Sequence, residues 1–508
     1  MENKGSTLFD ISKDYDQPVF TGEGSFEKNY EYCMKLKNKS SDILIRRFNL
    51  ADGRRCFVVT VDGMANKHLV EQDIILASRR FAEQSGENKF STEDAITQMF
   101  ASSELSVEKS LSNGYISALS GDALVVIEGS SEAYVLGYRA VNSRSVGESP
   151  NEGNVNGPHE AFTENIRFNT ALIRRRLGDP NLTIEHLKVG RRSHTIVALC
   201  YINGLTNPDI VDSLRKRINN IDVDILNDSG ELEQLLEEQP SNIFPQSGGS
   251  ELSDNAAAAL CNGRVVIMVN GSPNALTMPV TLSTLMKAPE DFYQRWTLSS
   301  FIRILRWIAL IVALIGPAYY VAVIAYNPGL LPTELLVTSA KNRANVPFSA
   351  VTEVLIIEFA LEMLREASIR MPKNVGTAIS IVGGIIIGDA AIQAGLISPL
   401  LIIIIGITTM ASFTLPSYTL ASSFRLMRYF ILALASILGI LGLAVGIILT
   451  VTLLAATQSF GARFTSPFMP LQKHDAAKSI IQMPIRKRTM RPAYCDPLDM
   501  IRSHSGDE

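Results

Sequence analysis

The sequence holds few of the residues from which disulfide frameworks and metal sites are made. Its five cysteines are scattered, with no CxxC pair and no Cys/His spacing typical of a metal site: Cys33, Cys56, Cys200, Cys261 and Cys495. We therefore expect no disulfide framework and no metal, and a reducing, cytoplasmic surrounding for the soluble part. Residues 1–17 contain no apolar stretch, so no secretory signal is expected there.

Signatures of catalysis are also missing. The chain has no glycine-rich phosphate loop, no nucleophile elbow and no HExxH sequence. Its six histidines stand apart from one another, mostly among polar residues. The net charge of −4 over 508 residues gives no bulk attraction to nucleic acid. These absences predict a protein that is not an enzyme, needs no cofactor and does not bind nucleic acid.

What the sequence has is a sharp change in character near residue 305. It is charge-rich up to Leu305, whereas Trp307 to Phe460 holds long apolar runs with few charges. The fold class we predict is therefore a soluble α/β region of two related subdomains, followed by an all-α polytopic membrane domain. The expected units are a flexible polar arm, the two subdomains, a transmembrane helical domain and a basic cytoplasmic tail, at residues 1–40, 41–145, 146–295, 300–460 and 461–508.

Four β-branched apolar runs, each closed by a small turn, predict buried strands in the front part. They are Cys56–Gly63, Ala123–Ser130, Ile196–Leu205 and Val265–Pro273. The first and third continue into VDGMANKHLVEQDI and INGLTNPDIVDSL, which share a strand, an xGxxN turn and an amphipathic helix. This similarity indicates an internal duplication, although such units also recur by chance in α/β proteins.

Four apolar stretches predict membrane spans of sufficient length: Trp307–Tyr326, Val375–Gln393, Ile397–Phe413 and one long span from Tyr429 to about Leu454. Basic residues before the first span favour a cytoplasmic soluble region, and those in the tail favour a cytoplasmic C-terminus. Arg425 and Arg428 favour the same side for the start of the last span, which conflicts with a single crossing there. We expect both termini to be cytoplasmic, with four full spans and one partial or interfacial helix.

That partial helix lies between Pro347 and Pro372 and carries four glutamates. At about 100° per residue, Glu358, Glu362 and Glu366 share one face and Glu353 points to the opposite side. Carboxylates at membrane depth are costly, so one hypothesis is a path for cations or protons. The other is an amphipathic helix at the interface, partly neutralised by arginines. Asp389 in the next apolar run is either a residue of the same path or a helix–helix hydrogen-bond partner.

Five segments together resemble the A subunits of spore nutrient-germinant receptors, the GerA family. They are GPHEAFTENIRFNTALIRRRLGDPNLTIEHLKVG from Gly157 to Gly190, FPQ at 244–246, GRVVIMVNGSP from 263, FIRILRW from 301 and SPFMPLQ from 466. The resemblance runs from about Ser41 to Pro470, and the block from Gly157 is its most specific part. His159, Ala161 and Asn156 depart from the residues that the family more often has.

The resemblance implies a receptor in the inner membrane of a bacterial spore, assembled with B and C subunits. In such receptors the transporter-like B subunit looks like the nutrient-binding part. The A subunit is expected to form a homo-oligomer that makes or gates an ion-conducting path in contact with membrane lipid. A paralogue encoded with spore dipicolinate-channel genes is similar, so a scaffold or accessory subunit of that system is an alternative. A secondary transporter is another alternative, but the membrane part is short for paired inverted repeats.

The residues of this chain that match the family motif are Gly157, Pro158, Glu160, Phe162, Thr163, Glu164, Asn165, Arg174, Arg175 and Arg176. A Gly-Pro turn followed by a helix with a basic face is expected, with Thr163 or Asn165 as its cap. One hypothesis is a subunit contact that transmits gating through arginine–carboxylate pairs. The other is a solvated helix with salt bridges inside the chain.

Overall fold

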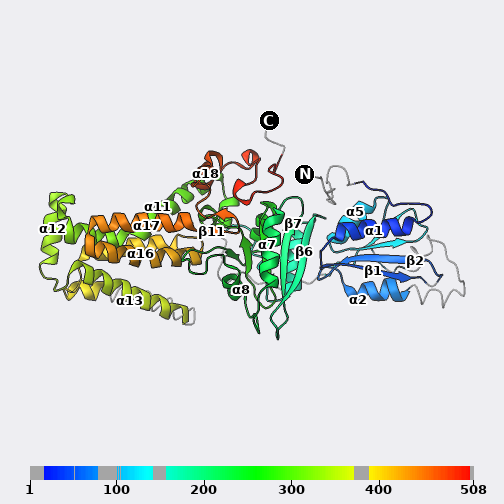
Figure 1. Cartoon of the computed structure of the whole chain (residues 1–508), viewed down its shortest axis with the longest axis horizontal. Helices are drawn as coiled ribbons and strands as arrows, with labels where there is room; N and C mark the ends of the chain where they lie inside the picture. The colour runs from blue at the N-terminus through cyan, green and yellow to red at the C-terminus, as the bar shows by residue number, and fades with distance from the viewer. Residues whose placement is uncertain are drawn as a thin grey trace.

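The computed structural model describes residues 16–50, 52–77, 100, 102, 104–140, 156–370 and 388–503. Three parts lie in a row along the long axis of the molecule (Figure 1). A first α/β subdomain occupies one end, a second α/β subdomain lies in the middle, and long helices extend from it at the other end. The predicted fold class, a mixed α/β front part followed by a helical part with apolar helices, is confirmed.

The first subdomain is built around a five-stranded sheet with the order β1-β2-β4-β5-β3, in which all neighbours are antiparallel. Apolar residues of α1 and α5 cover one face of this sheet, and residues of α2 and η1 pack on the other. Its elements are α1 Ser25–Lys37, β1 Ile43–Asn49, β2 Arg55–Val61, α2 Lys67–Val70, η1 Glu71–Leu76, β3 Leu105–Glu108, α5 Leu111–Leu119, β4 Ala123–Ile127 and β5 Ala133–Leu136.

Helix α1 falls in residues 1–40, for which the sequence predicts a flexible polar arm. Its side chains Phe26, Cys33 and Leu36 are buried in the core of the first subdomain. The polar composition of the segment hid this face, because an amphipathic helix needs only three or four apolar residues in every two turns. The described part of the arm, from residue 16 on, is therefore largely a structural element of the first subdomain.

The second subdomain repeats the arrangement. Its antiparallel sheet has the order β6-β7-β9-β10-β8, with α7 and α8 over one face and α6 and α9 over the other. Its elements are α6 Ile166–Arg176, β6 Leu182–Val189, β7 Thr195–Ile202, α7 Pro208–Asn219, α8 Ser229–Leu236, β8 Gly248–Ser250, α9 Ser253–Cys261, β9 Val265–Val269 and β10 Ala275–Met278.

Position by position, the two subdomains match. The order of elements along the chain is β1-β2-α2-β3-α5-β4-β5 in the first and β6-β7-α7-β8-α9-β9-β10 in the second. In each sheet the second and fourth strands of this order are neighbours, β2 with β4 and β7 with β9. In the two xGxxN turns Gly63 and Gly204 have φ values of 83° and 75°, and Asn66 and Asn207 accept hydrogen bonds from the first turns of α2 and α7. A repeated topology with repeated turn chemistry supports the internal duplication.

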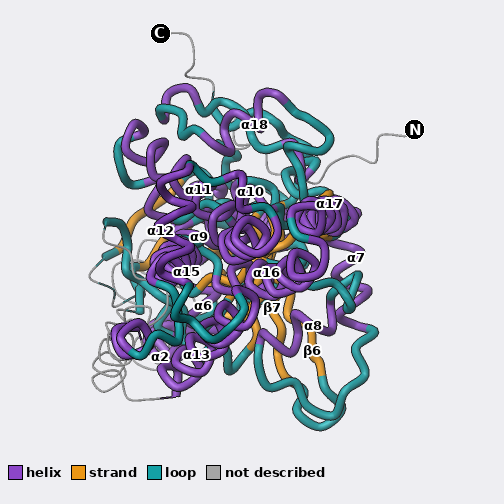
Figure 2. The backbone as a smooth tube through the Cα atoms, turned by 90° about the vertical axis from the view of Figure 1, so that its left-hand side faces the viewer, coloured by secondary structure: helices purple, strands orange, loops and turns teal. Residues whose placement is uncertain are grey.

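The helical part begins after a short α10 and η3 and contains α11, α12, α13, α15, α16 and α17 (Figure 2). Among the described residues, two helices are long and apolar enough to cross a membrane: α11 with the following η4 (Trp296–Tyr326), and α16. The helices α15 and α17 are apolar but shorter. The bounds are α10 Leu282–Leu285, η3 Pro289–Phe292, α11 Trp296–Val321, η4 Ala322–Tyr326, η5 Pro328–Leu330, α12 Thr333–Arg343, α13 Ala350–Arg370, α15 Pro399–Phe413, α16 Tyr418–Leu438 and α17 Ile440–Ala456.

The single long span predicted from Tyr429 to about Leu454 is wrong. The chain turns at Gly439, which has φ 59°, and α16 and α17 pack against each other as a helical hairpin. The turn is tight: a Cβ on Gly442 would lie 2.0 Å from the carbonyl oxygen of Leu434. Another predicted span, Val375–Gln393, falls mostly on residues 371–387, outside those that the structure describes.

After α17 the chain returns to the second subdomain and folds against it. The elements there are β11 Gln458–Ser459, β12 Ala462–Arg463, α18 Lys473–Ile480, η6 Ile485–Lys487 and η7 Ala493–Cys495. Arg491 donates to the carbonyl oxygen of Cys261 at 3.0 Å, and the backbone N–H of Leu498 donates to that of Leu205 at 2.9 Å. The predicted tail is thus folded onto the protein over its described length, up to residue 503.

Candidate functional site

The motif segment from Gly157 lies where the two subdomains meet. It enters α6 through Asn165, whose side chain accepts a hydrogen bond from the backbone N–H of Arg167 at 3.0 Å, so Asn165 is the N-cap. The Asn169 side chain holds the preceding turn by accepting from the N–H of Thr163 and donating to its carbonyl oxygen. Phe162 is buried in the core of the second subdomain.

Arg174 joins the two subdomains to each other. Its side chain is fully buried, and it donates to Asp42 just before β1 through Nε at 3.0 Å and Nη2 at 3.2 Å. It also donates to the carbonyl oxygens of Asp179 and Leu182. Nearby, the N–H of Ser41 donates to the carbonyl oxygen of Ile184 on β6, at 2.8 Å. Arg174 is therefore engaged inside the chain and not available to a neighbouring subunit in this conformation.

Arg175 and Arg176 share one partner, Glu160 of the same motif. Arg176 also donates from Nε to the hydroxyl of Ser253, at the start of α9, at 2.8 Å. The basic face of α6 thus has partners within the chain, as in the second of the two hypotheses for this helix. Arg175 remains more than half exposed, so among the three arginines it is the one that an outside partner can reach.

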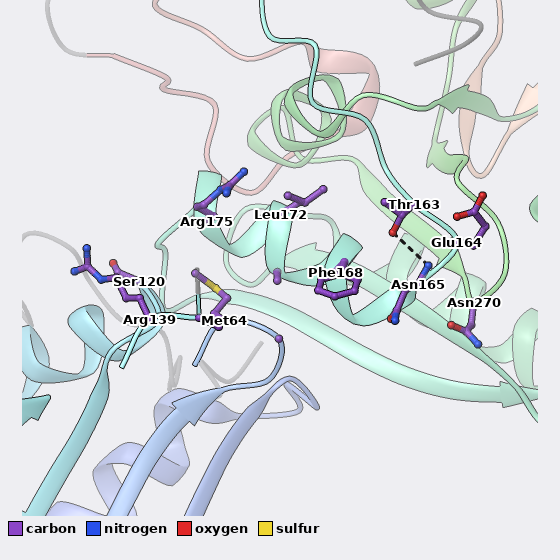
Figure 3. A pocket seen from close by; sticks show the side chains of 13 residues that line it. Met64, Ser120, Arg139, Thr163, Glu164, Asn165, Phe168, Leu172, Arg175 and Asn270 are labelled. Carbon is purple, nitrogen blue, oxygen red and sulfur yellow. Dashed lines mark hydrogen bonds between the residues drawn. The ribbon is translucent and has the colours of Figure 1, made fainter. Parts of the chain in front are cut away.

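A cleft of about 820 Å³ opens beside this helix, between the subdomains (Figure 3). The first subdomain contributes Gly63, Met64, Ser120, Arg139 and Ala140, and the second contributes Thr163, Glu164, Asn165, Phe168, Ala171, Leu172, Arg175 and Asn270. Arg139 is paired with Asp122 at 2.8 Å, and the Asn270 side-chain oxygen accepts from the N–H of Ile166. The cleft combines amide, hydroxyl and charged groups, and its volume is that of a small-molecule site.

From the cleft, polar contacts lead to the base of α11. Glu160 contacts Ser253, and the next residue, Asp254, accepts from the Tyr293 hydroxyl. The motif also touches Tyr293 directly, because a Cβ on Gly157, where φ is 124°, would lie 2.7 Å from the Tyr293 ring. Tyr293 follows η3 directly and lies three residues before Trp296, the first residue of α11. The motif therefore contacts both the subdomain interface and the entry to the first long helix.

At that entry, two arginines converge on one buried acid. Asp291 accepts from Arg303 Nε at 2.9 Å and from both terminal nitrogens of Arg306, also at 2.9 Å. All three side chains are buried. In the sequence alone the two arginines indicate membrane orientation, and nothing there marks Asp291 as their partner. One carboxylate between two guanidinium groups fixes α11 to the turn that precedes it.

In the helical domain, the glutamates of α13 are paired with arginines. Glu358 is buried and accepts from Arg428 of α16 at 2.8 Å, while Glu362 contacts Arg425 of α16 at 3.1 Å and Arg365 at 3.0 Å. These contacts place Glu358 and Glu362 on one face of α13, opposite an antiparallel α16. The expected acidic stripe thus meets a basic stripe formed by Arg425 and Arg428, which charge counting in the sequence assigns to membrane orientation.

The other acids of the predicted path lie elsewhere. Glu353 is buried, contacts Arg343 of α12 at 3.2 Å and accepts from the backbone N–H of Ser398 at 3.0 Å. Glu366 is 60% exposed and pairs with Arg370 one turn on. Asp389 is exposed and accepts from Gln393. Glu362 and Glu366 are the two glutamates of the stripe that keep substantial exposure.

Within the residues that the structure describes, no group of three or more His, Cys, Asp or Glu side chains has the arrangement of a metal site. The five cysteines are free, and burial raises the pKa of the Cys495 thiol to about 12.

Comparison with known proteins gives a consistent set of relatives. The model of the family described as "Bacillus/Clostridium GerA spore germination protein" matches residues 31–494. The chain is 36% identical over 484 residues to the uncharacterized membrane protein YfkQ of Bacillus subtilis (strain 168), covering 95% of this chain and 93% of that protein. It is 35% identical over 442 residues to spore germination protein A1 of the same organism, covering 84% of this chain and 91% of that one.

Among solved structures, the N-terminal domain of the A subunit of the Bacillus megaterium spore germinant receptor GerK3 aligns with a TM-score of 0.40. The two are 28% identical, and the alignment covers 52% of this chain and 96% of that domain.

Proposed function

Because this chain belongs to the GerA family of spore germination proteins, we propose that it is the A-type subunit of a germinant receptor whose helical domain makes or gates an ion-conducting path. The proposed partners are B- and C-type subunits and further copies of this chain. The proposed location is the inner membrane of the spore, with both termini on the cytoplasmic side.

The directions of the helices support this topology. α11 begins at the second subdomain, and α15 begins at the far end of α11, where the Ser398 hydroxyl lies 2.9 Å from that of Tyr320. α16 begins back at the second subdomain, where Ser423 donates to the carbonyl oxygen of Ile243, and α17 returns there, with Thr457 2.7 Å from Asn242. α11, α15, α16 and α17 thus alternate in direction, and the chain before α11 and after α17 lies on one side.

The observation that carries the gating part of the proposal is the set of contacts through the motif. A series of hydrogen bonds and ion pairs leads from the subdomain interface to the base of α11. It passes through Glu160, Arg176, Ser253, Asp254 and Tyr293. Beyond Tyr293, the buried pairs of Asp291 hold the first turns of α11. A change in the relative position of the subdomains therefore has a route of packed polar contacts to the helical domain.

The exposed carboxylates of α13 are the groups through which the helical domain meets a permeating ion. In this protomer Glu353 and Glu358 are buried against arginines, so they serve helix packing. Glu362 and Glu366 reach the surface on the same face, and in an oligomer they would be presented to an aqueous path or to a neighbouring copy. Rings of carboxylates in such a position favour cations.

The test uses the full-length chain with its B- and C-type partners, purified in detergent and reconstituted in a planar bilayer. The expected results are a mass above that of one copy of each subunit and a cation-selective conductance that responds to nutrient. Replacing Glu362 and Glu366 by glutamine should lower cation selectivity severalfold. The matched control replaces Glu23 and Glu31, which are exposed acids of the first subdomain, at the end of the molecule opposite the helical domain.

A second function, an accessory or scaffold subunit of the dipicolinate-channel system, is favoured by the arginine pairing of the α13 acids, since Glu358, Glu362 and Glu366 all have such a partner. A scaffold would bind its partners and leave the bilayer without conductance. An assembled, inserted complex that conducts no ions under any nutrient would contradict the ion-path proposal and support this one.

A further inference from the structure

The segment 466–490, between β12 and η7, is fixed beside the base of α11. In α18, the carbonyl oxygen of Lys478 accepts from Arg303, and the Ser479 hydroxyl lies 2.6 Å from that of Ser283. Just after α18, the N–H of Gln482 donates to the Ser300 hydroxyl at 3.1 Å. These bonds set the position of the segment relative to the first long helix.

Its depth follows from one aromatic contact. The ring of Phe468 packs edge-on against that of Trp307, with 5.4 Å between centroids. Trp307 opens the apolar stretch of α11, and tryptophan is enriched where a span crosses from water into lipid. Figure 2 looks at the molecule from the far ends of the long helices, and in this view α18 lies beside the bundle. The segment therefore extends sideways at the level where α11 enters the membrane.

The exposed side chains of this segment are of two kinds. Large apolar residues stand out, with Leu471 65% and Ile485 76% exposed, and with Met469, Ile480, Ile481 and Met490 exposed as well. Between them lie the exposed bases Lys473, Arg486 and Lys487. In the whole segment there are five basic residues (Lys473, Lys478, Arg486, Lys487 and Arg488) and one acid, Asp475. Single exposed apolar residues are ordinary, but a group of six among lysines and arginines is not.

We propose that segment 466–490 lies on the cytoplasmic surface of the bilayer and binds anionic phospholipid headgroups. The aliphatic side chains enter the boundary between headgroups and acyl chains, and the bases meet lipid phosphates. The lysine and arginine stems cover apolar surface while their charges stay among the headgroups.

Two observations favour lipid over a protein as the occupant. The segment is continuous with α17 and anchored to α11, so the membrane surface is its immediate neighbour if those helices are inserted. Among the side chains whose burial is described, the segment exposes lysines but no Phe, Tyr or Trp ring, whereas the cores of protein interfaces are depleted in lysine and enriched in aromatic residues. The inference rests on the membrane insertion in the proposed function, and on neither the ion path nor the partners.

The test places an environment-sensitive fluorophore at position 485, through Ile485→Cys in a Cys261→Ser background, because Cys261 is the one native thiol that is partly exposed. The labelled full-length chain is reconstituted in vesicles of phosphatidylcholine alone or with added phosphatidylglycerol. Lipids with a nitroxide on the headgroup serve as quenchers. With phosphatidylglycerol, the emission should shift to shorter wavelength and be quenched, and salt should weaken both effects.

The charge dependence is tested by replacing Lys473, Arg486 and Lys487 together by glutamine. Each basic residue near the membrane surface raises the ratio of bound to free segment about fivefold. Loss of three such residues should therefore shift this ratio roughly 100-fold towards the free form. The control replaces Lys28, Lys35 and Arg46, which are exposed bases of the first subdomain at the opposite end of the molecule (Figure 1), and should change nothing.

Three outcomes would overturn the proposal. Equal quenching in the triple variant, or without phosphatidylglycerol, would show that anionic headgroups are not bound. An unshifted and unquenched probe would show that the segment stands off the bilayer. A shifted probe that headgroup quenchers do not reach would mean that protein covers the segment. Failure of the proposed function looks different, because alkaline carbonate would then release the whole chain from the vesicles.

Discussion

Arg174 and Asp42 form a charged pair without access to water, and the pair connects α6 of one subdomain to the start of β1 in the other. Removing one partner of such a pair leaves an uncompensated buried charge, which typically costs about 3–5 kcal/mol. We predict that Arg174→Met lowers the free energy of opening of this interface by that amount. The measurement is hydrogen exchange of the β1 and β6 backbone amides in the full-length chain.

Two further variants give this prediction its controls. Arg175→Met, in which the side chain is more than half exposed, should change the same exchange rates by no more than about 1 kcal/mol. The double variant Asp42→Leu with Arg174→Met should recover most of the loss, because a matched apolar pair carries no stranded charge. Equal effects of the two single arginine variants would contradict the assignment of Arg174 as the interdomain contact.

Glu237, at the end of α8, has a carboxyl whose pKa is raised to about 7 by burial and by the charge of Glu233. Between pH 4.5, the ordinary value, and about 7, the folded state holds more protons than the unfolded state. The contribution of this group to stability therefore falls as the pH rises through that window. We predict that Glu237→Gln raises the thermal midpoint of the chain in detergent above pH 7 and leaves it unchanged near pH 4.

For comparison, the exposed Glu31 of α1 can be replaced by glutamine. This change should alter the midpoint equally little at both ends of the pH range. A Glu237→Gln variant that gains nothing above neutral pH would show that the carboxyl is solvated.

Single-residue roles were only partly predictable from the sequence. Asn165 could be proposed as a helix cap because its chemistry is local, acting two residues along the chain. Asp42 and Asp291 could not be found, because their partners are 132 and 12 residues away and nothing in their neighbours marks them as buried. Charge counting in the sequence predicts the side of the membrane on which basic residues lie, but it does not predict the acids with which they pair. This applies to Arg303, Arg306, Arg425 and Arg428.

At the scale of elements, the sequence predicts what is continuous and apolar. The four runs assigned as strands form β2, β4, β7 and β9, which lie side by side in their sheets and are buried on both faces. Strands such as β1 have one exposed face and an edge, so their composition is mixed and their pattern weak. The helical hairpin was not predicted for a related reason. Hydropathy values stay high through an apolar run, so they do not reveal a turn made by one glycine within it.

The hairpin gives the prediction at this scale. A Cβ on Gly442 would meet the backbone of α16, and no small shift of a side chain relieves that contact. We predict that Gly442→Ala lowers stability by about 1–3 kcal/mol, the usual effect of overpacking, seen as a lower thermal midpoint of the detergent-solubilised chain. Gly406→Ala on α15 is the control, because nothing lies within 4 Å of its Cβ position and alanine favours helix. If both variants melt alike, α16 and α17 are not packed as described.

At the scale of the whole molecule, the hairpin removes a conflict that the sequence could not resolve. Arg425 near the start of α16 and the bases of the tail both favour the cytoplasmic side, and one crossing between them cannot satisfy both. With α16 leading away from the second subdomain and α17 returning to it, both ends lie on the same side. The tail then has a fixed place against the second subdomain and α11, instead of hanging free.

This arrangement predicts which surfaces are accessible on each side of a membrane. Lys341 is exposed on α12, at the end of the helical domain farthest from the α/β subdomains (Figure 1), and Lys487 is exposed in the tail. In intact cells producing Lys341→Cys or Lys487→Cys, each in a Cys261→Ser background, a membrane-impermeant maleimide should label position 341 and spare position 487. Permeabilisation should expose position 487. The reason is that α16 crosses away from the cytoplasmic side and α17 crosses back to it, which leaves the tail inside. Labelling of both positions in intact cells, or of neither, would require a different number of crossings between α12 and the tail.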